Sequence, residues 1–282
     1  MEIKRAAVIG AGAMGSGIAY WCSFNGLNVS VTEQNDDLLK RGMQRIKDNV
    51  ITGVNKGKIT PKQAEEIMGR IRGTVDVAEA VKDADIVIEA VYENIDVKKE
   101  VFRKINDLAP SNAILATNTS SLSITEIASV TNRPEKVVGM HFFNPVPAMR
   151  LVEIVRGEKT SDETVKVIDD LSHRLKKETV TCRDSPGFIV NRILGPILNE
   201  AVLLLQEGIA SREDIDKAMT LGTNFPMGPL RLADFVGLDV ALEVSRTLER
   251  GFGEKYKPPQ LLVEKVQKGE LGIKTRKGFY EY

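Results

Sequence analysis

The chain has 282 residues, of which 42% are hydrophobic and 28% charged, a composition typical of a globular protein with a sizeable core. Its 39 Lys and Arg residues balance its 39 Asp and Glu residues, so the overall charge favours neither a nucleic acid nor an anionic membrane. No segment approaches the roughly 20 apolar residues of a membrane helix, and Cys22 and Cys182 lack the spacing of metal ligands. We therefore expect a cytoplasmic protein of about two domains, without a metal.

Short β-rich runs alternate with helical patterns through the first two thirds of the chain. The runs are continuously apolar, which indicates strands buried on both faces of a mostly parallel sheet. The predicted strands are residues 6–9, 29–33, 86–90, 113–117, 137–140, 151–155 and 178–181. Helices are expected between them, for example over residues 15–25 and 97–108.

One segment departs from this alternation. After Glu33 the sequence stays polar and helical until about residue 72, which is longer than a single crossover helix. Residues 55–58 are typical of a turn, and Thr60 with Pro61 is typical of a helix start. We therefore predict a helical hairpin, at about residues 38–72, inserted in the first domain.

The pattern changes again at residues 184–187, where a Ser-Pro-Gly sequence interrupts the alternation. Ser211, followed by acidic residues, has the form of a helix N-cap. We expect residues 1–184 to form an α/β domain and residues 185–282 to form an all-α domain. The helices predicted for the second domain are residues 188–205, 211–220, 234–250 and 259–268.

A glycine-rich turn links the first predicted strand to the first predicted helix. The first glycine of such a turn makes the chain reversal, the second lets a pyrophosphate approach the backbone, and the third lets helix and strand pack closely. In this context the turn predicts a Rossmann-type dinucleotide site, and the alternative is a turn that serves only packing. Its residues are Gly10, Ala11, Gly12, Ala13, Met14 and Gly15.

Glu33 ends the second predicted strand. A carboxylate at that position accepts hydrogen bonds from the adenosine ribose hydroxyls and repels a 2′-phosphate. The next residues, 34–37, contain no arginine that would bind such a phosphate. The sequence therefore favours NAD over NADP as the cofactor.

His141 is the one histidine that lies where a ligand is expected. It follows a predicted strand, and ligands of an open α/β sheet bind at the carboxyl ends of the strands. An imidazole titrates near neutral pH, which suits it to take a hydroxyl proton while hydride goes to a nicotinamide. His173 lies in an amphipathic helical pattern and is expected on the surface.

Glu153 interrupts the apolar run 151–155, and a carboxylate there is costly unless it is paired. Pairing with His141 would orient the imidazole and stabilise its protonated form. The alternative is an edge strand from which Glu153 points to solvent. Residues 118–121 (NTSS) follow another predicted strand and either supply polar groups to a substrate or cap the next helix.

Together these residues resemble the L-3-hydroxyacyl-CoA dehydrogenases, and in particular the short bacterial 3-hydroxybutyryl-CoA dehydrogenases. The resemblance covers essentially the whole chain. It implies reversible, NAD-dependent oxidation of (S)-3-hydroxybutyryl-CoA, or a related 3-hydroxyacyl-CoA, to the 3-ketoacyl-CoA. The matching motifs are GAGAMGSG at 10–17, NTSSLSITEI at 118–127, GMHFFNPVP at 139–147, LVEIV at 151–155, PGFIVNRIL at 186–194, MGPL at 227–230 and KGFY at 277–280.

The resemblance also implies roles for single residues. His141 would be the general base, with Glu153 to orient it, and Ser120 and Asn191 would hydrogen-bond the substrate oxygens. The family usually has Asp at the ribose position, so Glu33 is a small departure that leaves an NADP-preferring version open. The NAD site beside the glycine turn and Glu33 would be lined by Glu93, Lys98, Ser120 and Asn144.

The predicted hairpin is basic, with nine Lys or Arg residues against three acidic residues between positions 40 and 72. This excess suits the phosphates of coenzyme A. The resemblance points to Lys56 first and Lys58 second as the binding residues. The alternative is a solvated hairpin that binds no ligand.

The resemblance further implies a homodimer formed through the C-terminal helical domain, where residues 197–205 are more apolar than one buried face requires. Burial of this helix inside the domain explains the same pattern equally well. Two other functions stay open. One is a related dehydrogenase of a free small hydroxy acid, which would not need the basic hairpin. The other is a non-catalytic NAD-binding protein that retains the fold.

Overall fold

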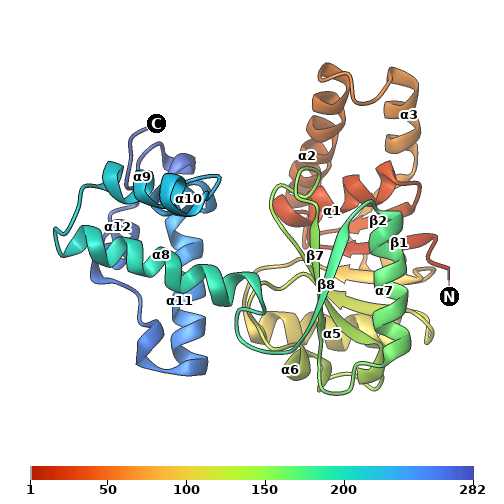
Figure 1. Ribbon diagram of the computed structural model, residues 1–282. Coiled ribbons are helices and arrows are strands. Elements are labelled where there is room, and N and C mark those ends of the chain that lie inside the picture. Colours follow the sequence, from red (N-terminus) through yellow and green to blue (C-terminus); the bar gives the residue numbers. More distant parts are fainter. Residues whose placement is uncertain (1) are drawn as a thin grey trace. The chain divides into compact units, whose positions relative to one another are not determined.

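The computed structural model describes residues 2–282 and divides into two compact units, one ending at Asp184 and the other formed by Ser185–Tyr282. The first unit, red to green in Figure 1, is built around one eight-stranded sheet with helices packed against it. The second unit, green-blue to blue, is helical. The predicted fold class, a mostly parallel Rossmann-type sheet with an inserted helical hairpin and an all-α part, is confirmed.

The sheet has the strand order β3-β2-β1-β4-β5-β6-β7-β8. All neighbours from β3 to β6 are parallel, β7 is antiparallel to β6, and β8 is parallel to β7. The order reverses between β1 and β4, and ligands of such sheets bind where the strands on either side of the reversal end. The strands are β1 (Arg5–Ile9), β2 (Asn28–Thr32), β3 (Ile71–Thr74), β4 (Ile86–Glu89), β5 (Ile114–Thr117), β6 (Val137–Phe142), β7 (Leu151–Arg156) and β8 (Glu178–Arg183).

Two features of the sheet differ from the sequence prediction. Strand β3 was not predicted, because only Ile71 of its four residues is buried and the segment continues the polar pattern of the hairpin. It forms because Ile71 pairs with Val29 and Thr74 with Thr32 at the edge of the sheet. Strand β8 was predicted to be buried on both faces, but it is the opposite edge, and its residues are exposed or half-exposed.

The helices of the first unit bury apolar side chains against the sheet. Ile18 of α1 and Ile46 of α2 are fully buried, as is Val8 in the central strand. These residues belong to one continuous core. The helices are α1 (Ala13–Phe24), α2 (Asp36–Asn55), α3 (Pro61–Gly69), α4 (Val77–Val81), α5 (Ile95–Leu108), α6 (Ile124–Ala128) and α7 (Asp162–Arg174), with a short 3₁₀ turn η1 (Pro134–Lys136).

Helices α2 and α3 form the predicted hairpin and project from the rest of the first unit (Figure 1). Asn35 caps α2 through a hydrogen bond from the Leu38 amide at 2.9 Å. Thr60 and Gln63 form a capping box at the start of α3, with Pro61 as its first residue. The turn and both helix starts are therefore fixed by local contacts.

The second unit contains one helix more than expected in its middle. The sequence predicts a single helix over residues 234–250, but Gly237, with φ of +104°, separates α10 from α11. Ser211 is the N-cap of α9, as predicted, and accepts a hydrogen bond from the Asp214 amide at 3.1 Å. The helices are α8 (Val190–Gln206), α9 (Arg212–Thr223), α10 (Pro229–Val236), α11 (Leu238–Phe252) and α12 (Gln260–Gln267), with 3₁₀ turns η2 (Glu254–Tyr256) and η3 (Ile273–Thr275).

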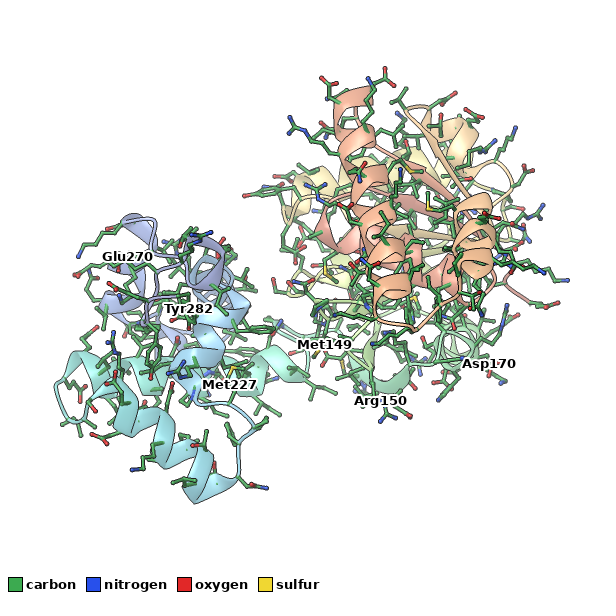
Figure 2. All side chains as sticks on the ribbon, turned by 90° about the horizontal axis from the view of Figure 1, so that it is seen from above. Met149, Arg150, Asp170, Met227, Glu270 and Tyr282 are labelled. Atoms are coloured by element: carbon green, nitrogen blue, oxygen red, sulfur yellow. The ribbon has the colours of Figure 1, made fainter. Side chains whose placement is uncertain are left out.

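Buried Asp234 in α10 anchors the C-terminal segment. Its carboxylate accepts hydrogen bonds from the amides of Phe279 and Tyr280, at 2.8 and 2.9 Å, and from the hydroxyl of Tyr282 at 3.1 Å. Tyr282 is labelled in Figure 2. A Cβ on Gly278 would lie 1.9 Å from this carboxylate, so the segment needs glycine at that position. Across residues 2–282, no helix is long and apolar enough to cross a membrane.

We predict that Thr60→Ala loosens the hairpin. The substitution removes the acceptor for the Gln63 amide, a cap that contributes about 1 kcal/mol. Hydrogen exchange of the first-turn amides of α3 should therefore become about fivefold faster, since about 1 kcal/mol corresponds to that factor. Thr52→Ala, at an exposed position inside α2, is the control and should leave exchange in α3 unchanged. Equal exchange in both variants would contradict the capping role.

Candidate active site

The glycine turn after β1 has the geometry that a bound pyrophosphate requires. Gly10 has φ of +94°, and a Cβ there would lie 2.7 Å from the carbonyl oxygen of Ala90. A Cβ on Gly15 would lie 1.8 Å from the carbonyl oxygen of Gly10. By contrast, a Cβ on Gly12 would meet nothing within 4 Å. Gly10 and Gly15 are therefore required by the chain's own packing, whereas Gly12 borders open space that a ligand can fill.

Helix α1 begins at this open space. Gly12 is its N-cap, and no side chain caps the first turn, which contains Ala13 and Met14. The first amides of a helix lack partners within the helix and carry the positive end of the helix dipole. This combination of bare amides and a glycine without a side chain fits a dinucleotide phosphate.

The Glu33 carboxylate is held against the same turn. Glu33 directly follows β2, one residue beyond the strand, and its Oε1 accepts a hydrogen bond from the Ala11 amide at 2.6 Å. This places the acidic group beside the turn, where the adenosine ribose of a bound dinucleotide is expected. Arg45 of α2 reaches the Ala11 carbonyl oxygen at 3.3 Å. Sequence reading missed Arg45, because only the packing of α2 brings it to the turn.

A buried lysine pairs with two glutamates at the end of β4 and in the loop that follows it. Lys98 of α5 is 1% exposed, and its Nζ lies 2.7 Å from Oε1 of Glu89 and 3.3 Å from Oε2 of Glu93. Glu89 is fully buried at the end of β4 and also accepts a hydrogen bond from the Thr117 hydroxyl at 2.6 Å. The sequence prediction contained Glu93 and Lys98 but not Glu89. A carboxylate within an apolar run was the available signal, the same one that marked Glu153.

Glu93 connects this lysine to the loop after β5. Its Oε1 accepts hydrogen bonds from the Thr119 hydroxyl at 2.6 Å and from the Ser120 amide and hydroxyl at 2.8 and 3.1 Å. Burial raises the pKa of Glu93, but the Lys98 ammonium and these hydrogen bonds outweigh it, so the pKa lies below its ordinary value of 4.5. Three predicted site residues, Glu93, Lys98 and Ser120, therefore form one connected group.

His141 and Glu153 form a buried pair. They are direct cross-strand partners in the antiparallel β6–β7 ladder, and His141 Nδ1 lies 2.7 Å from Glu153 Oε2. The histidine is 5% exposed and the glutamate is fully buried. The alternative of a solvent-facing Glu153 is therefore wrong, because β8 covers the outer edge of β7. His173, by contrast, is on the surface as predicted, with 54% of its side chain exposed.

The loops around this pair carry two asparagines. The side-chain oxygen of Asn118 accepts a hydrogen bond from the Phe142 amide at 2.9 Å, which ties the end of β6 to the loop after β5. Asn144 lies exposed in the β6–β7 loop. Ser123 caps α6, so the helix-capping alternative applies to Ser123, whereas Ser120 contacts Glu93. Among residues 2–282, no group of three His, Cys, Asp or Glu residues could hold a metal ion.

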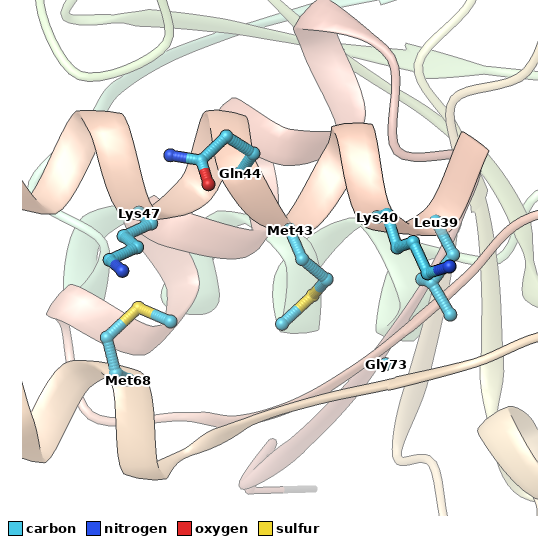
Figure 3. Close-up of a pocket in the computed structure, with 7 residues that line it drawn as sticks. All are labelled: Leu39, Lys40, Met43, Gln44, Lys47, Met68 and Gly73. Atoms are coloured by element: carbon cyan, nitrogen blue, oxygen red, sulfur yellow. The ribbon is translucent and has the colours of Figure 1, made fainter. Parts of the chain in front are cut away.

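The remaining predicted site residues lie outside this group. Lys56 and Lys58 are exposed in the turn between α2 and α3. Asn191 lies in the first turn of α8, in the second unit. Another side of α2 borders an open groove of about 510 Å³, which no sequence signal indicated (Figure 3). The groove is lined by Leu39, Lys40, Met43, Gln44, Lys47, Met68 and Gly73.

Comparison with known proteins places this site in a family. Residues 5–185 match the NAD-binding domain of 3-hydroxyacyl-CoA dehydrogenase, and residues 187–282 match the C-terminal domain of that enzyme. The chain belongs to the 3-hydroxyacyl-CoA dehydrogenase family. It is an NAD-dependent oxidoreductase, and the family implies an acyl-CoA substrate.

Individual members of the 3-hydroxyacyl-CoA dehydrogenase family match over the full length. A probable 3-hydroxybutyryl-CoA dehydrogenase from Bacillus subtilis is 47% identical, with 100% of this chain and 98% of the relative covered. A 3-hydroxybutyryl-CoA dehydrogenase from Clostridioides difficile is 46% identical, with 99% of each covered. The crystal structure of (S)-3-hydroxybutyryl-CoA dehydrogenase from Ralstonia eutropha is 44% identical, has a TM-score of 0.94, and covers 100% of this chain and 99% of that one.

We predict that Glu93 stabilises the protein in a pH-dependent way. Because its folded pKa lies below 4.5, the unfolded chain binds the proton more tightly, and this stabilisation is lost as the pH falls through the folded pKa. Glu93→Gln should therefore lower the urea midpoint at pH 7, and the difference from the wild type should shrink as the pH falls below about 4. Glu100→Gln, which removes an exposed carboxylate from α5, is the control. A difference that widens on acidification would refute the assignment.

Proposed function

We propose that this protein interconverts (S)-3-hydroxybutyryl-CoA and acetoacetyl-CoA with NAD, and that His141 moves the hydroxyl proton. The buried His141–Glu153 pair carries the proposal, because it couples a proton acceptor to a fixed carboxylate at the ligand-binding edge of the sheet. The four-carbon substrate is supported by the relatives at 46 and 47% identity, which are named as 3-hydroxybutyryl-CoA dehydrogenases.

The pairing decides how His141 would act. Glu153 is hydrogen-bonded to Nδ1, so Nε2 is the nitrogen that takes the 3-hydroxyl proton during oxidation and returns it during reduction. The Glu153 carboxylate fixes the ring orientation and stabilises the imidazolium that forms. NAD, when bound, accepts the hydride from C3. Ser120 and Asn191 would hydrogen-bond the substrate oxygens.

The dinucleotide would lie on the turn Gly10–Gly15, with its phosphates at the start of α1 and its ribose near Glu33. Glu93, Lys98 and Asn144 would line the same site. The open space at Gly12 and the uncapped helix start support this placement. The ion pairs between Lys98 and its two glutamates would keep the lysine fixed while the cofactor binds.

Coenzyme A would bind at the basic hairpin, with Lys56 as the first candidate and Lys58 as the second. Both lysines are exposed, so the phosphates of the coenzyme can reach them from solvent. Arg70 and Arg72 are paired with Glu66 and Glu79, whereas the ion pairs of the described residues include neither turn lysine.

We also propose a homodimer formed through the helical unit. Large apolar side chains are exposed there on three successive helices. They are Ile193 at 60%, Leu221 at 76% and Phe235 at 52%. Exposed apolar side chains of this size favour association, and analytical ultracentrifugation of the full chain tests it.

We predict that the wild type oxidises NADH with acetoacetyl-CoA, followed by absorbance at the NADH band. His141→Ala should lower kcat by about 100-fold or more while NADH still binds, because general acid–base catalysis contributes that much. His173→Ala, at an exposed histidine, should retain the wild-type rate. Absence of turnover in the wild type with both NADH and NADPH would overturn the proposed function. Near-normal turnover in His141→Ala would remove His141 from the mechanism.

The coenzyme A site has a separate test. Lys56→Glu should raise KM for acetoacetyl-CoA by about tenfold with little change in kcat, because it removes a contact made equally before and during the reaction. The rate with free acetoacetate should not change. Lys159→Glu, at an exposed lysine after β7, is the charge-matched control. An unchanged KM would place the coenzyme elsewhere, and a preference for the free acid would indicate a hydroxy-acid dehydrogenase instead.

A further inference from the structure

Lys177 is a buried cation without a carboxylate partner. It directly precedes β8 and is 3% exposed, yet none of the ion pairs in residues 2–282 includes it. Its Nζ donates instead to the main-chain carbonyl oxygens of Val146 and Met149, at 2.5 and 2.6 Å. The ammonium also lies 4.5 Å from the ring centroid of Trp21. Lys98, the other buried lysine near the site, contacts two glutamates.

Both carbonyl groups belong to the loop that joins β6 to β7. This loop comprises residues 143–150. One residue, Phe142, separates it from His141, and it ends just before β7, which carries Glu153. Met149 and Arg150 at its end are labelled in Figure 2. The chain between His141 and Glu153 runs through this loop, so the conformation of the loop affects how the two side chains align.

The loop is held from two sides. Val146 is 2% exposed and packs on α1, where a Cβ on Gly17 would lie 3.1 Å from its side chain. Lys177 holds the loop from the side of β8. The Trp21 ring that faces its ammonium is fixed by a 2.7 Å hydrogen bond from Trp21 Nε1 to the Leu175 carbonyl oxygen. The same helix α1 begins at the glycine turn, so one contact set connects the dinucleotide helix to the proton-transfer loop.

The charge of Lys177 makes this arrangement costly. Burial lowers the pKa of Lys177 to about 8, and the titratable group that faces it from α1 is Cys22. Burial raises the pKa of that thiol to about 12, so the thiol stays neutral and cannot offset the ammonium near pH 7. Arg150, which follows Met149, and Glu178, which follows Lys177, pair with each other at 2.9 Å and are largely exposed. A charged donor makes stronger hydrogen bonds to carbonyl oxygens than a neutral one. The ammonium therefore holds the two loop carbonyls more firmly than a neutral side chain would.

We propose that Lys177 is a positioning residue of the dehydrogenase, which fixes the β6–β7 loop through the Val146 and Met149 carbonyls and thereby holds His141 and Glu153 in alignment. The inference rests on the proposed function of that pair. Lys177 itself contacts the loop carbonyls and Trp21, and takes no part in the proposed proton transfer. Its proposed role explains why a charged side chain is buried there.

The test compares Lys177→Met, Lys177→Arg and Lys176→Met with the wild type. Lys176 is the adjacent, exposed lysine, so Lys176→Met makes the same chemical change without the loop contacts. Hydrogen exchange of residues 143–150 measures the loop, and exchange of the β1 and β4 amides shows whether each variant is folded. Fluorescence titration with NADH gives the concentration of intact NADH sites. The kcat with acetoacetyl-CoA is then expressed per NADH site, so that unfolded protein does not lower it.

We expect Lys177→Met to exchange the loop amides at least about tenfold faster and to lose about 10- to 100-fold in kcat per NADH site, since small misplacements of reacting groups cost that much. Lys177→Arg keeps a charged donor for the same carbonyl oxygens, so both its loop exchange and its kcat per NADH site should lie closer to the wild type than those of Lys177→Met. Lys176→Met should match the wild type.

Unchanged loop exchange in Lys177→Met would overturn the proposal, as would faster exchange with an unchanged kcat. Failure of Lys177→Arg to recover either measure would show that the cation is not what matters, which also overturns it. A wild type without turnover would refute the proposed function alone. In that case the loop exchange of the three variants still decides whether Lys177 holds the loop.

Discussion

The antiparallel return of β7 along β6 is the contact on which the proposed proton transfer depends. Strands β1 to β6 are all parallel and end at one edge of the sheet, where the glycine turn also lies. Reversing the direction of β7 sets Glu153 directly opposite His141, and β8 then covers the outer edge. In this poorly solvated position the carboxylate interacts strongly with the imidazole, and water does not compete for either group.

The parallel register explains why polar groups from distant parts of the chain meet. Ile9 pairs with Glu89, Glu89 with Thr117 and Thr117 with Gly139, so the last residues of β1, β4 and β5 form one row. His141 lies two residues beyond this row on β6. The glycine turn, the Lys98 ion pairs and the histidine are therefore successive positions along a single edge of the sheet, as expected for a doubly wound fold.

The two buried lysines near the carboxyl ends of the strands have different kinds of partners. Lys98 is neutralised by Glu89 and Glu93, and the hydrogen bonds of Thr117, Thr119 and Ser120 fill the remaining carboxylate positions. Lys177 has only carbonyl oxygens and an aromatic face. The first arrangement fixes a buried lysine between two carboxylates. The second fixes a loop, at the cost of a charge that the surroundings do not neutralise.

Features that depend on neighbours within a few residues could be predicted from residue order. The cap at Ser211 and the start of α3 at Thr60 and Pro61 were predicted, because each is defined by contacts at most four residues apart. The glycine turn was predicted from the spacing of its glycines between a strand and a helix. His141 was singled out by its place at a strand end.

Features that depend on strand order and register became visible only in the folded chain. An apolar run does not reveal its direction or its neighbours, so the sequence left Glu153 between a paired and a solvent-facing position, missed β3, and placed β8 in the interior. Glu89, Arg45 and Lys177 gain Thr117, Ala11 and Val146 as partners from segments more than 25 residues away in the chain. Local hydrogen bonds can be read from residue order, whereas the partners of a buried charge are fixed only when the whole sheet has assembled.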